Sequence, residues 1–147
     1  MLWYDIFKHE EIEMKNVDIE INELKLNLME VCNKNTCYPQ QQSEWTKENP
    51  FLGHCAVVAL TVYKHFGGKI MRGVIKETGV SHYWNNVNDK DYDLTKEQFK
   101  NKITIVNVED VSVYRLLNNP DTANRFLELN KQLDNFIFTK KQKEQSR

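Results

Sequence analysis

Three residues in the middle of the sequence have the types needed for nucleophilic chemistry: Cys55, His82 and Asp93. Cys55 stands at the predicted start of a helix, directly after Pro50-Phe51-Leu52-Gly53. Free backbone N–H groups and the positive end of the helix dipole favour a thiolate there, and the same N–H groups could stabilise an oxyanion. A cysteine on an apolar helix stripe is more often a packing residue, so this position alone favours a structural role.

His82 changes that balance, because a thiol nucleophile needs a base within about 3 Å and imidazole is the usual one near neutral pH. It lies on a predicted strand, within Ser81-His82-Tyr83-Trp84-Asn85. A cysteine at a helix start that faces a histidine on a strand is the arrangement of papain-like and transglutaminase-like enzymes. A third group must hold the imidazole in one tautomer, and Asp93, eleven positions further along, is placed to do so.

The position of Asp93 relative to His82 depends on the register of the hairpin between them. A four-residue loop over 86–89 brings the two residues opposite each other, with Cβ atoms about 5 Å apart. A two-residue turn at Asp89-Lys90 instead places Asp93 opposite Asn86, too far from His82 for a direct hydrogen bond. Turn propensity does not separate these registers strongly, and we predict the four-residue loop because the triad requires it.

The elements that must position these residues follow from hydrophobic spacing. Apolar residues at helical intervals predict a helix from Val17 to Val31. An almost wholly apolar helix over 54–66, stopped by Gly67-Gly68, is predicted to be the central buried helix. Strands are predicted over 69–76, 80–87, 92–95 and 103–108, then a helix capped by Asp110 and a last helix from Asn119-Pro120. This order indicates an α+β fold, with helices packed on a small antiparallel sheet.

We expect a single domain over residues 16–138, an N-terminal appendage over 1–15, and a charged, frayed tail over 139–147. The 147 residues are 40% hydrophobic and 28% charged, which is ordinary for a folded domain. A net charge of −1 gives no bulk attraction to nucleic acid or an anionic membrane, and no apolar run could span a bilayer. Three cysteines and no basic, apolar leader predict a cytoplasmic protein.

Six further residues are candidates for substrate binding or oxyanion stabilisation: Tyr38, Trp45, Asn49, Gly53, His54 and Trp84. Asn49 stands six residues before Cys55, about where papain-like enzymes place a side-chain oxyanion donor, although Asn-Pro is more often a turn. Gly53 would let a substrate backbone approach closely. The three aromatic residues could line a substrate cleft and are equally expected in the core.

The sequence predicts neither a metal nor a cofactor. Cys32, Cys37 and His54 do not have the spacing of a zinc site, because no second Cys/His pair accompanies them. A glycine-rich phosphate-binding loop is also absent.

Several short runs between Val17 and Phe99 occur in a distinctive order: Thr36-Cys37-Tyr38-Pro39, Trp45, Asn49-Pro50, 53–60, Phe66-Gly67-Gly68, 81–85 and 93–99. In this order and spacing the chain resembles the YunG-like family of small, poorly characterised bacterial and phage-type proteins. The resemblance implies a reduced papain-like or transglutaminase-like core with Cys55, His82 and Asp93 as a Cys-His-Asp triad, and it implies no particular substrate. The family pattern usually has glutamine just before the nucleophile, where this chain has His54, which could replace a glutamine donor only in a suitable tautomer.

The resulting hypothesis is a thiol-dependent hydrolase or acyl transferase that acts on an amide or related acyl carbon of a protein, peptide or small amide. Cys55 would attack the carbon, His82 would shuttle the proton and Asp93 would orient His82. One alternative is a catalytically silent module that binds a peptide or metabolite on the same fold. Another is a hydrolase for a small non-peptide ligand.

Overall fold

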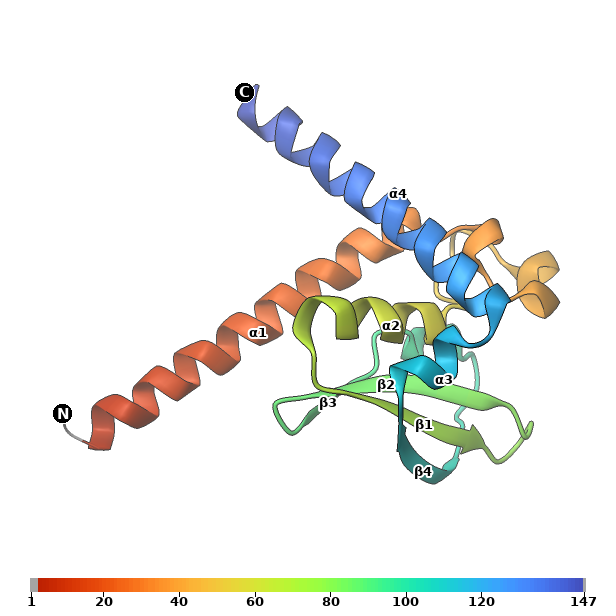
Figure 1. Cartoon of the computed structure of the whole chain (residues 1–147), viewed down its shortest axis with the longest axis horizontal. Coiled ribbons are helices and arrows are strands. Elements are labelled where there is room, and N and C mark those ends of the chain that lie inside the picture. The colour runs from red at the N-terminus through yellow and green to blue at the C-terminus, as the bar shows by residue number, and fades with distance from the viewer. Residues whose placement is uncertain (1–2, 147) are drawn as a thin grey trace.

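The strands form one antiparallel sheet, and the helices lie on one side of it (Figure 1). The computed structural model describes residues 3–146, with side chains from residue 16 onward. The helices in this range are α1 (Trp3–Val31), α2 (Cys55–Phe66), α3 (Val113–Leu117) and α4 (Pro120–Gln145). The strands are β1 (Lys69–Ile75), β2 (Ser81–Val87), β3 (Lys90–Tyr92) and β4 (Ile105–Val111), in the order β3-β2-β1-β4. Short 3₁₀ turns, η1 (Lys34–Thr36), η2 (Pro39–Glu44) and η3 (Lys96–Gln98), lie between them. The α+β class is confirmed.

α2 is the central helix, as its apolar circumference predicts. Its residues from Val57 to Val62 are buried, partly against α1 and α4 and partly against β1 and α3. Gly67 ends the helix at a φ of 71°, a conformation that glycine adopts without the steric cost of a Cβ atom. The apolar stripes predicted for α1 and α4 meet α2 in the same core: Val17, Ile21, Leu24, Leu28 and Val31, with Phe126, Leu129, Leu133, Phe136 and Ile137.

The two long helices extend beyond their predicted bounds. α1 is continuous from Trp3, so no break in the backbone marks the predicted boundary at residue 15. The side chains of residues 1–15 lie outside the described residues, and so do the contacts predicted for that appendage. α4 continues to Gln145, so the predicted frayed tail is helical as far as that residue. None of the described helices is both long and apolar enough to cross a membrane.

Two strands differ from their predicted ranges by two or more residues at both ends. β3 covers Lys90–Tyr92 rather than 92–95, and β4 continues to Val111. Asp110 therefore lies inside a strand, and the predicted cap of α3 is wrong. Ser112 caps that helix instead, because its side chain accepts a hydrogen bond from the backbone N–H of Tyr114.

The β2–β3 hairpin has neither of the two predicted registers. Val87 pairs with Lys90, so the loop consists of Asn88 and Asp89, with φ of 53° and 64°. Two positive φ angles are typical of a two-residue turn whose twist matches the flanking strands, and Asn and Asp tolerate them. β3 ends at Tyr92, opposite Asn85. On that side the earlier part of β2 has no strand partner among the described residues.

Candidate active site

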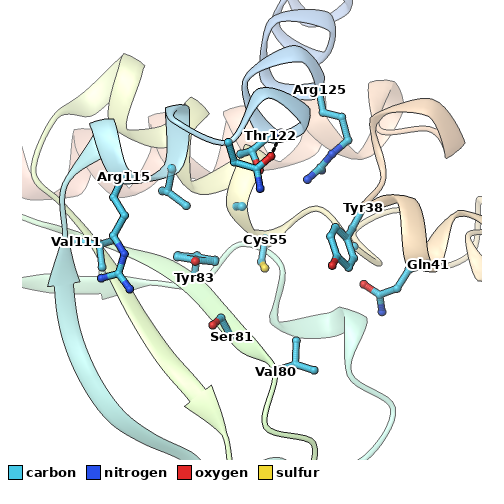
Figure 2. A pocket seen from close by; sticks show the side chains of 14 residues that line it. Tyr38, Gln41, Cys55, Val80, Ser81, Tyr83, Val111, Arg115, Thr122 and Arg125 are labelled. Atoms are coloured by element: carbon cyan, nitrogen blue, oxygen red, sulfur yellow. Dashed lines mark hydrogen bonds between the residues drawn. The ribbon is translucent and has the colours of Figure 1, made fainter.

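Cys55 is the first residue of α2, and its partly exposed side chain opens into a cavity of about 370 Å³. Figure 2 shows its sulfur pointing away from the helix, toward the space between Tyr38 and Tyr83. The backbone N–H groups of Cys55 and Ala56 form no hydrogen bond with a described residue outside the helix, and the N-cap residue makes no side-chain cap. The helix start therefore presents free donors beside the thiol.

His82 and Asp93 form a short hydrogen bond. His82 Nε2 lies 2.7 Å from Asp93 Oδ2, and the histidine is 2% exposed. A carboxylate only accepts, so Nε2 carries the proton in this bond. The other oxygen, Oδ1, accepts from the backbone N–H and the hydroxyl of Thr95 at 3.2 and 3.4 Å. The carboxylate is thereby held in the orientation that it needs to fix the imidazole.

Two aromatic side chains enclose the imidazole of His82. Trp84 stacks with it at a centroid distance of 5.8 Å, and Phe99 packs its edge at 5.0 Å. Because side chains alternate along a strand, His82 and Trp84 are not on the side of β2 from which Ser81 and Tyr83 line the cavity. Trp84 therefore supports the imidazole and does not line the cavity above the thiol.

The Cys55 thiol is a close neighbour of the imidazole without forming an aligned hydrogen bond. Burial disfavours the charged ring, but the hydrogen bond to Asp93 and the interaction with Cys55 outweigh burial and raise the pKa of His82 to about 9. Nδ1 is nevertheless buried and has no hydrogen-bond partner among the described residues. The thiol is thus near enough to affect the charge of the ring, although no hydrogen bond joins it to Nδ1.

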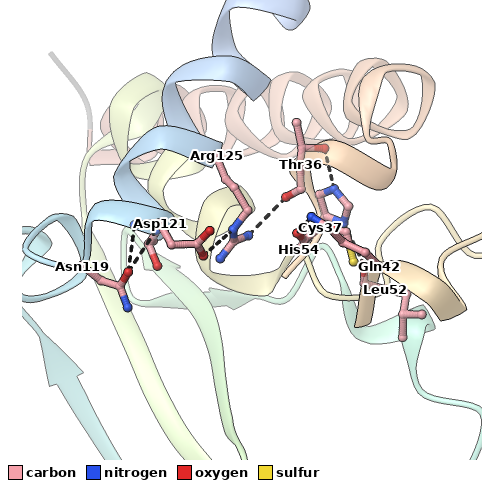
Figure 3. A network of polar contacts seen from close by, with 9 residues as sticks. Thr36, Cys37, Gln42, Leu52, His54, Asn119, Asp121 and Arg125 are labelled. Carbon is pink, nitrogen blue, oxygen red and sulfur yellow. Dashed lines mark hydrogen bonds and ion pairs between the residues drawn. The ribbon is translucent and has the colours of Figure 1, made fainter. Parts of the chain in front are cut away.

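His54 is not directed into the site, contrary to the predicted oxyanion role. It is fully buried, with Nδ1 2.8 Å from the Leu52 carbonyl oxygen and Nε2 2.7 Å from Thr36 Oγ1 (Figure 3). Burial lowers the pKa of His54 to about 4, so the ring is neutral near pH 7. Nδ1–H must then donate to Leu52, and Nε2 accepts from the Thr36 hydroxyl. Neither nitrogen is left to donate to a substrate, and the side chain instead joins η1 to the start of α2.

Asn49 and Trp45 also brace the loop before α2 instead of lining the cavity. The Asn49 amide donates to the Gln98 carbonyl oxygen at 3.2 Å. Trp45 Nε1 donates to the Pro50 carbonyl oxygen at 2.9 Å. The substrate roles predicted for these two residues therefore find no support in their positions.

Tyr38 and Gly53 do line the cavity with Cys55. The glycine is also required by the backbone, because its φ is 71° and a Cβ atom there would lie 2.5 Å from Cys37 Sγ. Its carbonyl oxygen accepts from the Tyr38 backbone N–H at 2.9 Å. Gly53 thus lets the loop that carries Tyr38 lie against the start of α2. This is a structural reason for a glycine at this position, in addition to the close approach of a substrate that the sequence predicts.

Sequence reasoning missed several residues that complete the site. Thr95 orients Asp93, and its signal was the Asp-x-Thr spacing, which allows a side chain to bond the backbone two residues on. Arg115 and Arg125 line the cavity from α3 and α4, although both are far from Cys55 in sequence. The only local sign was the i,i+4 spacing of Asp121 and Arg125, which form an ion pair at 2.9 Å.

The comparisons with known proteins identify a family. No solved structure matches the chain significantly. The uncharacterized protein YunG of Bacillus subtilis (strain 168) is 43% identical to it over 58 residues, which are 40% of this chain and 49% of that relative. The chain thus matches about half the length of that relative. The family model described as YunG protein matches residues 20–137, most of the sequence, and the chain therefore belongs to the YunG family.

Proposed function

We propose that this protein is a thiol-dependent hydrolase or acyl transferase, with Cys55 as nucleophile, His82 as proton shuttle and Asp93 as the group that orients His82. One observation carries the proposal. His82 is buried with Nε2 bound to Asp93 at 2.7 Å, while Nδ1 has no hydrogen-bond partner in the part of the chain that the structure describes and the partly exposed thiol of Cys55 is its neighbour. A merely structural histidine would be expected to have both ring nitrogens satisfied, as His54 does.

The chemistry follows from the hydrogen bond between His82 Nε2 and Asp93. Nε2–H is donated to Asp93, so Nδ1 is the nitrogen that takes the proton of the Cys55 thiol. The raised pKa of His82, about 9, keeps that proton on the ring near pH 7, so the attacking species is a thiolate beside an imidazolium. The thiolate attacks the acyl carbon, a C–S bond forms, and the carbonyl π electrons move to oxygen. When the tetrahedral intermediate collapses, the C–N bond breaks and the imidazolium returns its proton to the leaving amine. Water or a second amine then attacks the thioester, loses a proton to His82, and releases the thiolate.

The start of α2 supplies the electrostatic part of this mechanism. The negative charge that develops on the substrate oxygen needs donors that are already in place. The backbone N–H groups of Cys55 and Ala56 satisfy this requirement, because both are free of partners outside the helix and both residues line the cavity. These two N–H groups take the oxyanion role that the sequence predicts for Asn49 and His54.

The reduced papain-like or transglutaminase-like core remains part of this proposal. In its favour, the nucleophile begins the central helix and the base lies on a strand packed against that helix. A buried hydrogen bond of 2.9 Å from Asn85 Nδ2 to the Ala59 carbonyl oxygen joins β2 to α2. This bond limits sliding of the strand along the helix and so maintains the relative position of Cys55 and His82.

Acylation by p-nitrophenyl acetate tests the assignment without knowledge of the natural substrate. We expect release of p-nitrophenolate together with an acetyl group on Cys55, detected by peptide mass spectrometry. His82→Ala should slow acylation by about 10²- to 10⁴-fold at pH 7, because the base is lost. His65→Ala is the matched control, since His65 is an exposed residue at the other end of α2. Acetylation elsewhere, or an unchanged rate in a folded His82→Ala variant, would refute the proposal.

A catalytically silent binding module is the second candidate, and one observation favours it. The thiol and Nδ1 are not aligned in a hydrogen bond, so the pair is not already in a reactive arrangement. The same experiment separates the two functions. A binding module would leave Cys55 with the acylation rate of an ordinary exposed thiol, independent of His82.

A further inference from the structure

The cavity above Cys55 has an uneven distribution of charge. Its lining contains two arginines, Arg115 and Arg125, and no aspartate or glutamate among the described residues. The remaining polar lining residues are neutral: Tyr38, Gln41, Ser81, Tyr83, Asn119 and Thr122. Figure 2 shows the two arginines on opposite sides of the Cys55 sulfur, one projecting from α3 and the other from α4. The space in front of the thiol therefore favours a negatively charged ligand.

Arg125 is held in place before any ligand arrives. It is 7% exposed, its Nε donates to Asp121 at 2.9 Å, and its Nη1 donates to the Thr36 carbonyl oxygen at 3.1 Å (Figure 3). The guanidinium also lies over the Tyr38 ring at 5.8 Å. Its Nη2 makes no hydrogen bond with a described residue, and Arg125 is one of the residues that line the cavity. Arg125 is thus an ordered cation with donor capacity left for a ligand.

Arg115 adds a second cation that its local partner does not fully neutralise. It lies 3.2 Å from Glu109 Oε1, and Arg72 shares the same carboxylate at 3.3 Å. Two guanidinium groups therefore compete for one carboxylate. Only Arg115 of this pair lines the cavity, and its side chain is 58% exposed, so it is able to turn toward a ligand.

We propose that Arg125 and Arg115 bind a carboxylate of the substrate, so that the acyl compound attacked by Cys55 is anionic, such as an acidic amino-acid amide or the end of a peptide. This inference rests on the proposed function, and it names the substrate class of that site. A cavity of about 370 Å³ has the size of sites for small ligands and accommodates such a compound. A planar, bidentate guanidinium suits a carboxylate better than it suits a neutral amide.

Two alkylating reagents of nearly equal size test the charge preference. Iodoacetate carries a carboxylate and iodoacetamide is neutral, so the ratio of their rates at Cys55 reports the field in front of the thiol. We expect this ratio in the folded protein to exceed the ratio at the same cysteine in urea by several-fold, and to fall as salt screens the arginines. Arg115→Gln should lower the ratio, whereas Arg72→Gln should not, although both remove one partner of Glu109.

A second variant addresses Arg125, which also has a structural role. Arg125→Gln is combined with Asp121→Asn so that no carboxylate is left unpaired, and circular dichroism confirms folding. The ratio should fall further in this variant than in Arg115→Gln. In the wild-type protein, succinate should slow the alkylation of Cys55 by iodoacetamide, and succinamide should not.

The outcomes separate the two proposals. If the ratio of the iodoacetate rate to the iodoacetamide rate is equal in the wild-type protein, Arg115→Gln and Arg72→Gln, and succinate gives no protection, the carboxylate inference is overturned. The assignment of Cys55 as nucleophile would not be affected. Iodoacetamide rates that do not respond to His82→Ala would overturn the proposed function, whatever the preference for charge.

Discussion

Asp93 binds Nε2 of His82 at 2.7 Å even though the two residues are not opposite each other in their hairpin. If the register of β2 and β3 continued past Tyr92, Asp93 would face Trp84, which lies two residues from His82 on the same side of the strand. The carboxylate therefore reaches its partner along the diagonal, a distance that side chains can span. The chain leaves the ladder at Asp93, and Thr95 orients the carboxylate oxygen that His82 does not use.

Asp93→Asn should lower the pKa of His82 from about 9 toward the ordinary histidine value. The substitution keeps the size of the side chain but removes the negative charge, while the burial that disfavours the imidazolium remains. An NMR titration of the imidazole C–H resonances measures the change. Asp91→Asn is the control, because Asp91 accepts its hydrogen bond from Asn86 on the exposed surface. Equal effects of the two variants would contradict the specific pairing.

Stability should fall as the pH rises from about 6.5 to 9. The folded pKa of His82 is raised above the unfolded value, so the stabilisation is complete below pH 6.5 and is lost as His82 deprotonates near pH 9. The difference corresponds to roughly 3 kcal/mol at most. Urea unfolding at about pH 6, 8 and 10, which spans the titration of His82, measures this difference against His82→Gln. Parallel stability curves for both proteins would show that His82 does not contribute.

Cys55 should react with iodoacetamide much faster than Cys32 and Cys37. Both of the latter are buried, and burial raises the pKa of Cys37 to about 11 and that of Cys32 above the ordinary range. Mass spectrometry of the alkylated peptides gives the three rates in the folded protein. In urea the three rates should converge. A folded protein in which Cys55 is no faster than the buried pair would show that its thiol is closed off.

Thr36→Val should destabilise the loop before α2 by about 1–3 kcal/mol, because it leaves Nε2 of buried His54 without a donor and the backbone N–H of Asn33 without its acceptor. The two side chains have nearly the same shape, so the loss reports these two hydrogen bonds more than packing. Thr78→Val is the control, since that exposed hydroxyl only accepts a 3.3 Å bond from Val80. Its effect should stay within about 0.5 kcal/mol. Chemical denaturation measures both variants, and similar losses would refute the role of Thr36.

Val62→Ala should cost roughly 1–3 kcal/mol of unfolding free energy through lost burial and a cavity in the core. Val62 is 0% exposed and packs among the residues shared by α1, α2 and α4. Val108→Ala, at a 54% exposed position of β4, is the matched control. The midpoint of urea unfolding should shift for the first variant only. An unchanged midpoint for Val62→Ala would mean that α2 is not the central helix.

The sequence by itself determined the elements and several of their ends. Hydrophobic spacing located α1, α2 and α4, because a helix buries every third or fourth residue whatever its distant neighbours are. Gly67 marked the end of α2, since a left-handed terminal residue is a local requirement. The same local reasoning placed Cys55 at the start of that helix and His82 on a strand.

Only the tertiary structure decided where side chains point and which distant residues meet. The turn at Asn88-Asp89 set a hairpin register that neither predicted alternative contained, because the competing turns differ little in local energy. His54 turned toward Thr36 because a buried ring must satisfy both nitrogens, and its partner lies in the preceding loop. Arg125 reached the cavity through the packing of α4 on α2, and residues so far from Cys55 in sequence leave no periodic signal of their meeting.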